Sequence, residues 1–280
     1  MNAFDLDILA YLHKFTFKSY AFDHAINTIA TLDITKGVPM MALFWWAWTI
    51  RDEHTKSRHR ILIATIFSAF ISLALGRVLA HALPFRIRPL FDQNLPFTFP
   101  LAQANQTLRS WSAFPSDHAM LWSAVATGIY ICSKRIGLIA FIFTAVFICF
   151  PRVYIGLHHP TDILAGAFLG IAVTLILTRE KICAFLVRPF ERWSIASPQS
   201  FYLIAFIASY GFATTFSEAR DLANSLGRYI GHGPRIEAQD TKGSPEGSPD
   251  AFAYASTPRD GPTATAQNPQ LADNTPQSSW

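Results

Sequence analysis

Charged residues are scarce in this 280-residue chain, which has 15% Asp, Glu, Lys and Arg against 51% apolar residues. Such a composition is unusual for a soluble domain and ordinary for a protein whose outer surface faces lipid. The three cysteines, Cys132, Cys149 and Cys183, form no C-x-x-C pair and no cluster with histidine. The sequence therefore indicates neither a disulfide framework nor a zinc site, and we expect the cysteines to pack as small apolar residues.

Three further features are missing. The basic residues form no stripe, despite a formal charge of +4, so the sequence does not indicate nucleic-acid binding. The first twenty residues lack a continuous apolar core, so we expect no cleavable signal peptide, and residues 1–24 are predicted to be an amphipathic interfacial segment. Residues 231–280 have few large apolar side chains and hold seven of the 17 prolines, which predicts a disordered C-terminal tail.

Apolar runs dominate residues 25–230, which we predict to be a transmembrane domain. Six segments can cross a bilayer, so the predicted fold is an all-α, polytopic membrane helix bundle. Several are shorter than the roughly 20 residues of a perpendicular span, and the first reaches that length only from about Ala25. The six segments are Val38–Ile50, Ile61–Leu83, Ala119–Cys132, Ile136–Phe150, Ile163–Leu177 and Phe201–Phe216.

Basic residues gather in three of the connections between these segments. The connections are Arg51–Arg60, Lys134–Arg135 and Arg179–Arg192. Alternating spans place all three on one side of the membrane, and the positive-inside tendency makes that side cytoplasmic. We therefore expect an integral protein of a bacterial inner membrane, with both termini and the loops between the other spans outside the cytoplasm.

Ionisable residues gather at membrane depth on the opposite side, where they are costly and usually mark a functional site. They come from the loop after the second span, the start of the third, and the turn between the fourth and fifth. The residues are Arg86, Arg88, Ser116, Asp117, His118, Arg152, His158, His159 and Asp162. Each group alone has an ordinary structural explanation, but their joint occurrence on one side predicts a shared site.

The residue types suit phosphate chemistry. Ser116 is the predicted N-cap of a helix, whose free N–H groups bind anions, and His118 lies in its first turn. Pro160 is the predicted first residue of the fifth helix, so His158 lies on the turn before it, where Asp162 can hold one ring nitrogen protonated. Arginine forks match phosphate oxygens, and these groups suffice for phosphoryl transfer without a metal or another cofactor.

Two residues on the second span have two interpretations. Arg77 and His81 are one helical turn apart and face the same side of that helix. They either support the site or pair with phosphates at the membrane interface, and the second interpretation is slightly favoured.

At these residues the sequence resembles the type 2 phosphatidic acid phosphatase family, which includes undecaprenyl-diphosphate phosphatases and vanadium haloperoxidases. The family has three ordered signatures, Lys-x6-Arg-Pro, Pro-Ser-Gly-His and Ser-Arg-x5-His-x3-Asp. They correspond here to Arg88-Pro89, to Pro115–His118, and to Arg152 followed by His158 and Asp162. The resemblance covers roughly residues 77–170 and is specific, because three spaced patterns agree.

The resemblance implies a role for each matching residue. His158 would be the nucleophile, Asp162 its orienting carboxylate and His118 the general acid. Phosphate ligands would be Arg88, Arg152 and Ser116, with the backbone N–H of Asp117.

Three positions depart from the family pattern. His81 stands at the Lys position, so one cation is weakened or missing, and Arg86 or Arg77 would compensate. Asp117 replaces Gly, and its carboxylate must turn away from a bound anion. Pro151 replaces Ser and has no backbone donor.

The predicted activity is that of an integral membrane lipid phosphatase that acts through a phosphohistidine. A polyprenyl diphosphate such as undecaprenyl diphosphate is the first expected substrate, because the layout looks like that of the undecaprenyl-diphosphate phosphatases. Phosphatidic acid and phosphatidylglycerophosphate come next. The alternatives are a lipid phosphotransferase, in which an alcohol resolves the intermediate, and a non-catalytic lipid-binding or transport protein.

Overall fold

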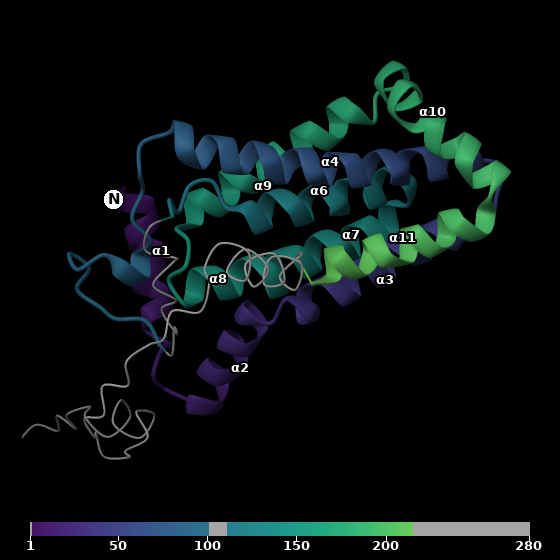
Figure 1. The fold of residues 1–280 in the computed structure, drawn as a ribbon. Helices are drawn as coiled ribbons and strands as arrows, with labels where there is room; N and C mark the ends of the chain where they lie inside the picture. The colour runs from purple at the N-terminus through teal and green to yellow at the C-terminus, as the bar shows by residue number, and fades with distance from the viewer. Residues whose placement is uncertain (1, 101–110, 215–280) are drawn as a thin grey trace, which may run out of the picture. The chain divides into compact units, whose positions relative to one another are not determined.

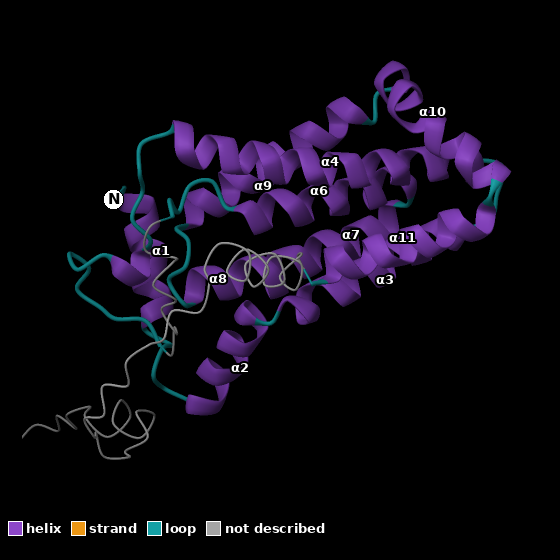
Figure 2. Cartoon of the chain, viewed as in Figure 1, coloured by secondary structure: helices purple, strands orange, loops and turns teal. Residues whose placement is uncertain are grey.

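The computed structural model of the chain describes residues 2–100 and 111–214, and this part is built from helices and loops without a strand (Figure 2). The predicted tail at 231–280 and the end of the transmembrane domain at residue 230 lie outside the described residues. The helices in chain order are α1 (Ala3–His13), α2 (Tyr20–Thr31), α3 (Asp33–Thr49), α4 (Thr55–Ala82), η1 (Pro89–Phe91), α6 (Asp117–Cys132), α7 (Lys134–Phe143), η2 (Thr144–Cys149), α8 (Phe150–Tyr154), α9 (Pro160–Leu177), α10 (Glu180–Ala196) and α11 (Pro198–Ala213). The all-α prediction is confirmed.

Three helices within the described part of the chain are long and apolar enough to cross a membrane. They are Thr55–Ala82, the continuous run Lys134–Tyr154 made of α7, η2 and α8, and Pro160–Leu177. These are the second, fourth and fifth predicted spans. The first, third and sixth fall in α3, α6 and α11, which have 17, 16 and 16 residues.

The first predicted span does not extend back to Ala25 in one helix. Leu32 is extended and separates α2 from α3, and its backbone N–H closes the last turn of α2 on Thr28. The N-terminal segment likewise forms two helices rather than one, because α1 ends at His13 and α2 begins at Tyr20, capped by Ser19. Part of α1 is buried against α8 and α9, with Asp5 and Leu9 fully enclosed.

Helix α6 is the centre of the bundle, as Figure 1 shows, with α4, α7 and α9 packed around it. Every residue from Ala119 to Ile129 is buried, so this helix is enclosed by protein on all sides. Its start is therefore fixed in space by three neighbours. The residues Ser116–His118 at the start of α6 are therefore held in a defined position.

Glycine permits the closest approach between α6 and α9. A Cβ atom at Gly170 would lie 2.2 Å from the backbone oxygen of Met120, and one at Gly166 would lie 2.6 Å from that of Ser116. A backbone atom cannot move aside as a flexible side chain can, so a methyl group would separate the two helices.

We expect Gly170→Ala to destabilise the protein by about 1–3 kcal/mol through this overpacking. Thermal unfolding in detergent would show it as a lower midpoint. Phe168→Leu is the matched control on the same helix, because the Phe168 side chain is exposed. Equal midpoints for the glycine variant and the wild type would contradict this packing.

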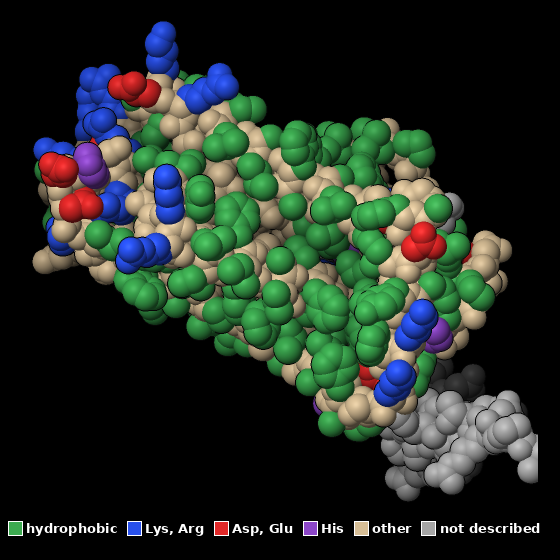
Figure 3. Space-filling model, turned by 180° about the vertical axis from the view of Figure 1, so that it is seen from behind, with side chains coloured by type: hydrophobic (Ala, Val, Ile, Leu, Met, Phe, Trp, Pro, Cys, Tyr) green, Lys and Arg blue, Asp and Glu red, His purple; other side chains and the backbone are tan. Residues whose placement is uncertain are grey.

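The three basic connections meet at one end of the bundle. The Cys132 thiol lies 3.7 Å from the Arg58 carbonyl, the Cys183 thiol lies 3.7 Å from the Arg60 carbonyl, and Arg60 pairs with Glu191. Figure 3 shows more Lys and Arg side chains at one end of the molecule than at the other, and apolar side chains over the middle of the face shown. Exposed apolar residues over spanning helices suit contact with lipid, and the protein is a membrane protein.

Candidate active site

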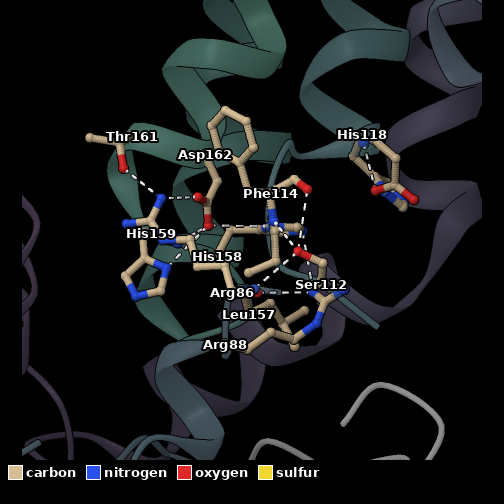
Figure 4. Close-up of polar contacts among 12 residues, drawn as sticks. Arg86, Arg88, Ser112, Phe114, His118, Leu157, His158, His159, Thr161 and Asp162 are labelled. Atoms are coloured by element: carbon tan, nitrogen blue, oxygen red, sulfur yellow. Dashed lines mark hydrogen bonds and ion pairs between the residues drawn. The ribbon is translucent and has the colours of Figure 1, made fainter. Parts of the chain in front are cut away.

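The predicted site residues lie together at the end of the bundle away from the basic connections. The Arg88 guanidinium donates to the Leu157 carbonyl at 2.9 Å, which ties the loop after α4 to the turn between α8 and α9. The Ser116 backbone N–H donates to the Asp162 carbonyl at 3.2 Å, which ties the start of α6 to the start of α9. Three segments distant in sequence thus share one site (Figure 4).

His158 is 2% exposed and is held in one tautomer. Its Nδ1 lies 2.8 Å from the Ala113 carbonyl oxygen, which can only accept, so Nδ1 carries the hydrogen in the neutral ring. The other nitrogen, Nε2, therefore has a lone pair and lies 3.4 Å from Nη1 of Arg88. Burial, and then the cations Arg88 and Arg152, hold the pKa of His158 well below its ordinary value. The result is a neutral imidazole with Nε2 free to act as a nucleophile.

The geometry of Asp162 differs from the sequence-based expectation. Its Oδ2 is 3.9 Å from His158 Nδ1 but accepts from the His159 backbone N–H at 2.8 Å and lies 3.1 Å from His159 Nδ1. Asp162 is the third residue of α9 and reaches back to the N-cap, His159, in a capping box. The contact that orients His158 in this structure is the Ala113 carbonyl, which no sequence motif marks.

His118 is oriented by its neighbour in sequence. Its Nδ1 lies 2.9 Å from Asp117 Oδ1, and the other oxygen of that carboxylate pairs with Arg77 at 3.1 Å. The Asp117 carboxylate thus turns toward His118 and Arg77. His118 Nε2 is 3.8 Å from Asp33 Oδ1, beyond hydrogen-bond distance.

Unpartnered polar atoms concentrate at this site. Among residues 2–100 and 111–214, eight buried side-chain nitrogen or oxygen atoms have no hydrogen-bond partner, and four of them belong to predicted site residues. The four are Arg88 Nε, Ser116 Oγ, His118 Nε2 and Arg152 Nε. Ser116 is the N-cap of α6 as predicted, yet its hydroxyl caps no N–H and stays available. Leaving buried polar atoms unpaired is costly, so their occurrence in four predicted site residues favours a place for an anion.

A cavity of about 280 Å³ is lined by Arg88 of these four residues and by Pro115 and Asp117, the neighbours of Ser116. Its lining includes the nucleophile candidate His158, the cations Arg77 and Arg88, and the side chains of His81, Trp111 and Asp117. Arg77 and His81 therefore belong to the wall of the site cavity. If these two residues only paired with phosphates at the membrane interface, their position in the cavity wall would not be explained.

Arg86 contacts carboxylates at the site instead of facing the cavity. It donates to Asp162 Oδ1, to Asp5 Oδ2 at 2.6 Å and to Thr161 Oγ1 at 2.9 Å. Asp5 is fully buried and also accepts from the backbone N–H and hydroxyl of Thr161, at 2.9 and 2.7 Å. Arg86 thus positions the start of α9, and it does so with a partner from α1.

Sequence reasoning missed Asp5, Asp33 and Lys36. Lys36 is fully buried, pairs with Asp33 at 2.9 Å and donates to the Ala30 carbonyl, so that an ion pair from α3 lies beside His118. The sequence did contain a signal for this buried pair, namely an aspartate and a lysine one helical turn apart at the start of an apolar helix. Asp5 had a weaker signal, because an acidic residue in a mixed helix usually faces water.

Comparison with known proteins finds a family model that matches the segment holding these motifs. The model of the PAP2 superfamily matches residues 60–181. YbjG of Escherichia coli (strain K12), provisionally named an undecaprenyl-diphosphatase, is 30% identical over 140 residues, which are 49% of this chain and 63% of YbjG. The undecaprenyl-diphosphatase of Sulfolobus acidocaldarius is 31% identical over 115 residues, which are 41% of this chain and 52% of that protein.

A third relative has a different kind of name. The bacitracin transport permease protein BcrC of Bacillus licheniformis is 26% identical over 132 residues, which are 46% of this chain and 59% of BcrC. The chain thus spans between about half and two thirds of the length of these relatives, and no solved structure matches it. The resemblance found in the three motifs is confirmed: residues 60–181, which hold every one of them, match the model of the PAP2 superfamily.

Proposed function

We propose that the protein is an integral membrane lipid phosphatase that transfers a phosphoryl group from a lipid diphosphate or phosphomonoester to His158 and then to water. The observation that carries this proposal is the neutral His158 with Nε2 unprotonated, together with four buried polar atoms of predicted site residues that lack partners. The names of two relatives, one an undecaprenyl-diphosphatase and one provisionally named so, favour undecaprenyl diphosphate as substrate. Phosphatidic acid and phosphatidylglycerophosphate are the next candidates.

The proposed steps use only side chains of the site. Nε2 of His158 attacks the terminal phosphorus, and the bond from that phosphorus to its leaving oxygen breaks while His118 gives this oxygen a proton. The leaving oxygen is the bridging oxygen of a lipid diphosphate, so lipid monophosphate departs, or the ester oxygen of a lipid phosphomonoester, so the lipid alcohol departs. His118 then takes a proton from water, whose oxygen attacks the phosphohistidine and releases phosphate and neutral His158. Arg88, Arg152 and Ser116 stabilise the charge on the phosphoryl oxygens. The Ala113 carbonyl stabilises the imidazole ring, which is positively charged while it carries the phosphoryl group.

Phosphate release from detergent-solubilised protein tests the proposal. We expect release from undecaprenyl diphosphate, and more slowly from phosphatidic acid, to continue in EDTA because arginines neutralise the phosphoryl charge in place of a metal. Release that requires a divalent metal would contradict the mechanism. Absence of release from either lipid would contradict the activity.

The pH dependence of the reaction follows from the charge around His158. Because burial and the two arginines lower its pKa, His158 stays neutral and nucleophilic below its ordinary pKa of about 6.5. We expect the acidic limb of kcat/KM, which reports the free enzyme, to lie below pH 6.5. Arg88→Gln removes one of these cations and should move the limb to higher pH, besides lowering the rate. A limb at or above pH 6.5 in the wild type would contradict this environment.

We also propose that the site faces the extracytoplasmic side of a bacterial inner membrane. The support is the position of the basic connections at the other end of the bundle. A cysteine introduced at exposed Asn94, near the site, should react in intact cells with a thiol reagent that cannot cross the membrane. One at exposed Glu53 should react only after lysis, and the reverse pattern would contradict the orientation.

A further inference from the structure

The site cavity contains more positive charge than one transferred phosphoryl group uses. Arg88 lies beside His158, and Arg77 forms another part of the same wall. The Arg77 guanidinium stacks on the Trp111 ring at 4.3 Å and pairs with Asp117 Oδ2 at 3.1 Å. A guanidinium has five N–H donors, and within the described residues that of Arg77 makes one hydrogen bond, to Asp117. It is held in place and still has donors for a second anion.

Asp117 is a counterion that tolerates an incoming anion at Arg77. One of its oxygens accepts from both the backbone N–H and Nδ1 of His118, at 2.8 and 2.9 Å. Only the other oxygen faces Arg77. The carboxylate therefore stays anchored to His118 when another anion takes donors of Arg77.

Exposure orders the lining of the cavity from its reactive end to its mouth. His158 and Arg88 are 2% and 8% exposed, whereas the Arg77 side chain is 35% exposed. Leu83 and Phe85, which also line the cavity, are 40% and 56% exposed. The intermediate exposure of Arg77 favours a path in which a lipid with its reacting phosphoryl group at His158 and its chain along Leu83 and Phe85 passes this arginine. The group that follows the reacting phosphoryl in a lipid diphosphate is the second phosphate.

We propose that Arg77, held by Trp111 and Asp117, binds the second, non-transferred phosphate of a lipid diphosphate, with His81 at the rim of this subsite. The proposal rests on the proposed phosphatase activity and specifies its substrate class as diphosphates over monophosphates. His81 occupies the position of the family lysine, and its Nδ1 contacts the Arg77 carbonyl at 2.8 Å. In this chain the cation placed toward the lipid is thus Arg77, which lies on α4 one helical turn before the position of the family lysine.

Two substrates with the same lipid chain isolate the second phosphate. We would measure kcat/KM for phosphate release from farnesyl diphosphate and from farnesyl phosphate in detergent. Arg77→Gln should lower the ratio of the diphosphate value to the monophosphate value by roughly 10- to 100-fold, the effect of losing a charged hydrogen-bond partner of the second phosphate. Arg77→Lys, which keeps the charge and loses the fork, should recover part of the loss. Arg60→Gln, at the other end of the bundle, is the control and should change neither value.

Binding provides a second measurement that does not depend on turnover. In a His158→Ala background, calorimetry should show tighter binding of the diphosphate than of the monophosphate, and Arg77→Gln should remove that difference. Equal losses for both substrates, or an unchanged preference in the variant, would overturn the subsite while leaving the phosphatase activity standing. Failure of wild-type protein to hydrolyse either substrate would overturn the activity, and the binding difference would then decide on the subsite alone.

Discussion

Replacing His158 by alanine should reduce phosphate release to background, a loss of roughly 10³-fold or more. The reason is geometric as well as chemical. His158 is the imidazole whose Nδ1 is fixed by a backbone carbonyl and whose Nε2 stays unprotonated beside Arg88. Water that replaced the ring would lack both its nucleophilicity and its position. Initial rates with undecaprenyl diphosphate measure the loss directly.

The phosphohistidine intermediate allows the same prediction to be tested directly by labelling the protein. Substrate labelled in the terminal phosphate should transfer label to wild-type protein, and a quench in alkali, where phosphohistidine is stable, should retain it. His158→Ala should carry no label. The matched control is His159→Asn, which changes the adjacent histidine to another good N-cap residue. That variant should be labelled, and label on His158→Ala, or its loss in the control, would reassign the nucleophile.

The spacing of the motifs predicted which polar residues lie at the same end of the bundle. Ser116 lies at the start of α6 and Pro160 begins α9, as the capping and proline signals predicted. Because helix ends are determined by local sequence, the side of the bundle on which each polar group lies could be predicted without a structure. Because Arg88, Ser116 and His158 were predicted on the same side of the bundle, we could also predict that they lie near one another.

Contacts between distant segments could not be predicted in this way. The Ala113 carbonyl that orients His158 is a backbone group, and backbone groups are the same in every sequence. The pairing of Asp162 with His159 and Arg86 depends on competition among near neighbours within a few ångströms. Asp5 lies 81 residues before Arg86 in the chain, and no local pattern encodes such a pair.

Removing the Asp5 carboxylate should strongly destabilise the protein, by about 3–5 kcal/mol, the usual cost of removing one partner of a buried ion pair. Asp5→Ala leaves Arg86 without one carboxylate and the Thr161 N–H and hydroxyl without an acceptor. Thermal unfolding in detergent should show a much lower midpoint. Asp7→Ala, an exposed aspartate on the same helix, is the control and should change the midpoint little.

The pH dependence of this loss identifies its electrostatic part. Burial alone would raise the pKa of Asp5, but hydrogen bonds from Thr161 and Arg86 outweigh burial and lower it. A carboxylate with a lowered folded-state pKa contributes stability that is full above its ordinary pKa of 3.8 and is lost as the pH falls through its folded-state value. The midpoint difference between wild type and Asp5→Asn should therefore be largest near neutral pH and shrink below about pH 3.8. A difference that does not vary with pH would assign the effect to packing.

Activity should fall together with stability, because Arg86 joins Asp5 to the start of α9. Asp5→Ala frees Arg86 to shift, and Arg86 holds Asp162 and Thr161, which begin the helix directly after His158. A loss of kcat at temperatures where the variant is fully folded would separate this positioning effect from unfolding. If both residues act through one network, Asp5→Ala combined with Arg86→Leu should lose less stability and activity than the sum of the single losses. Additive losses would mean that α1 covers the site without taking part in its alignment.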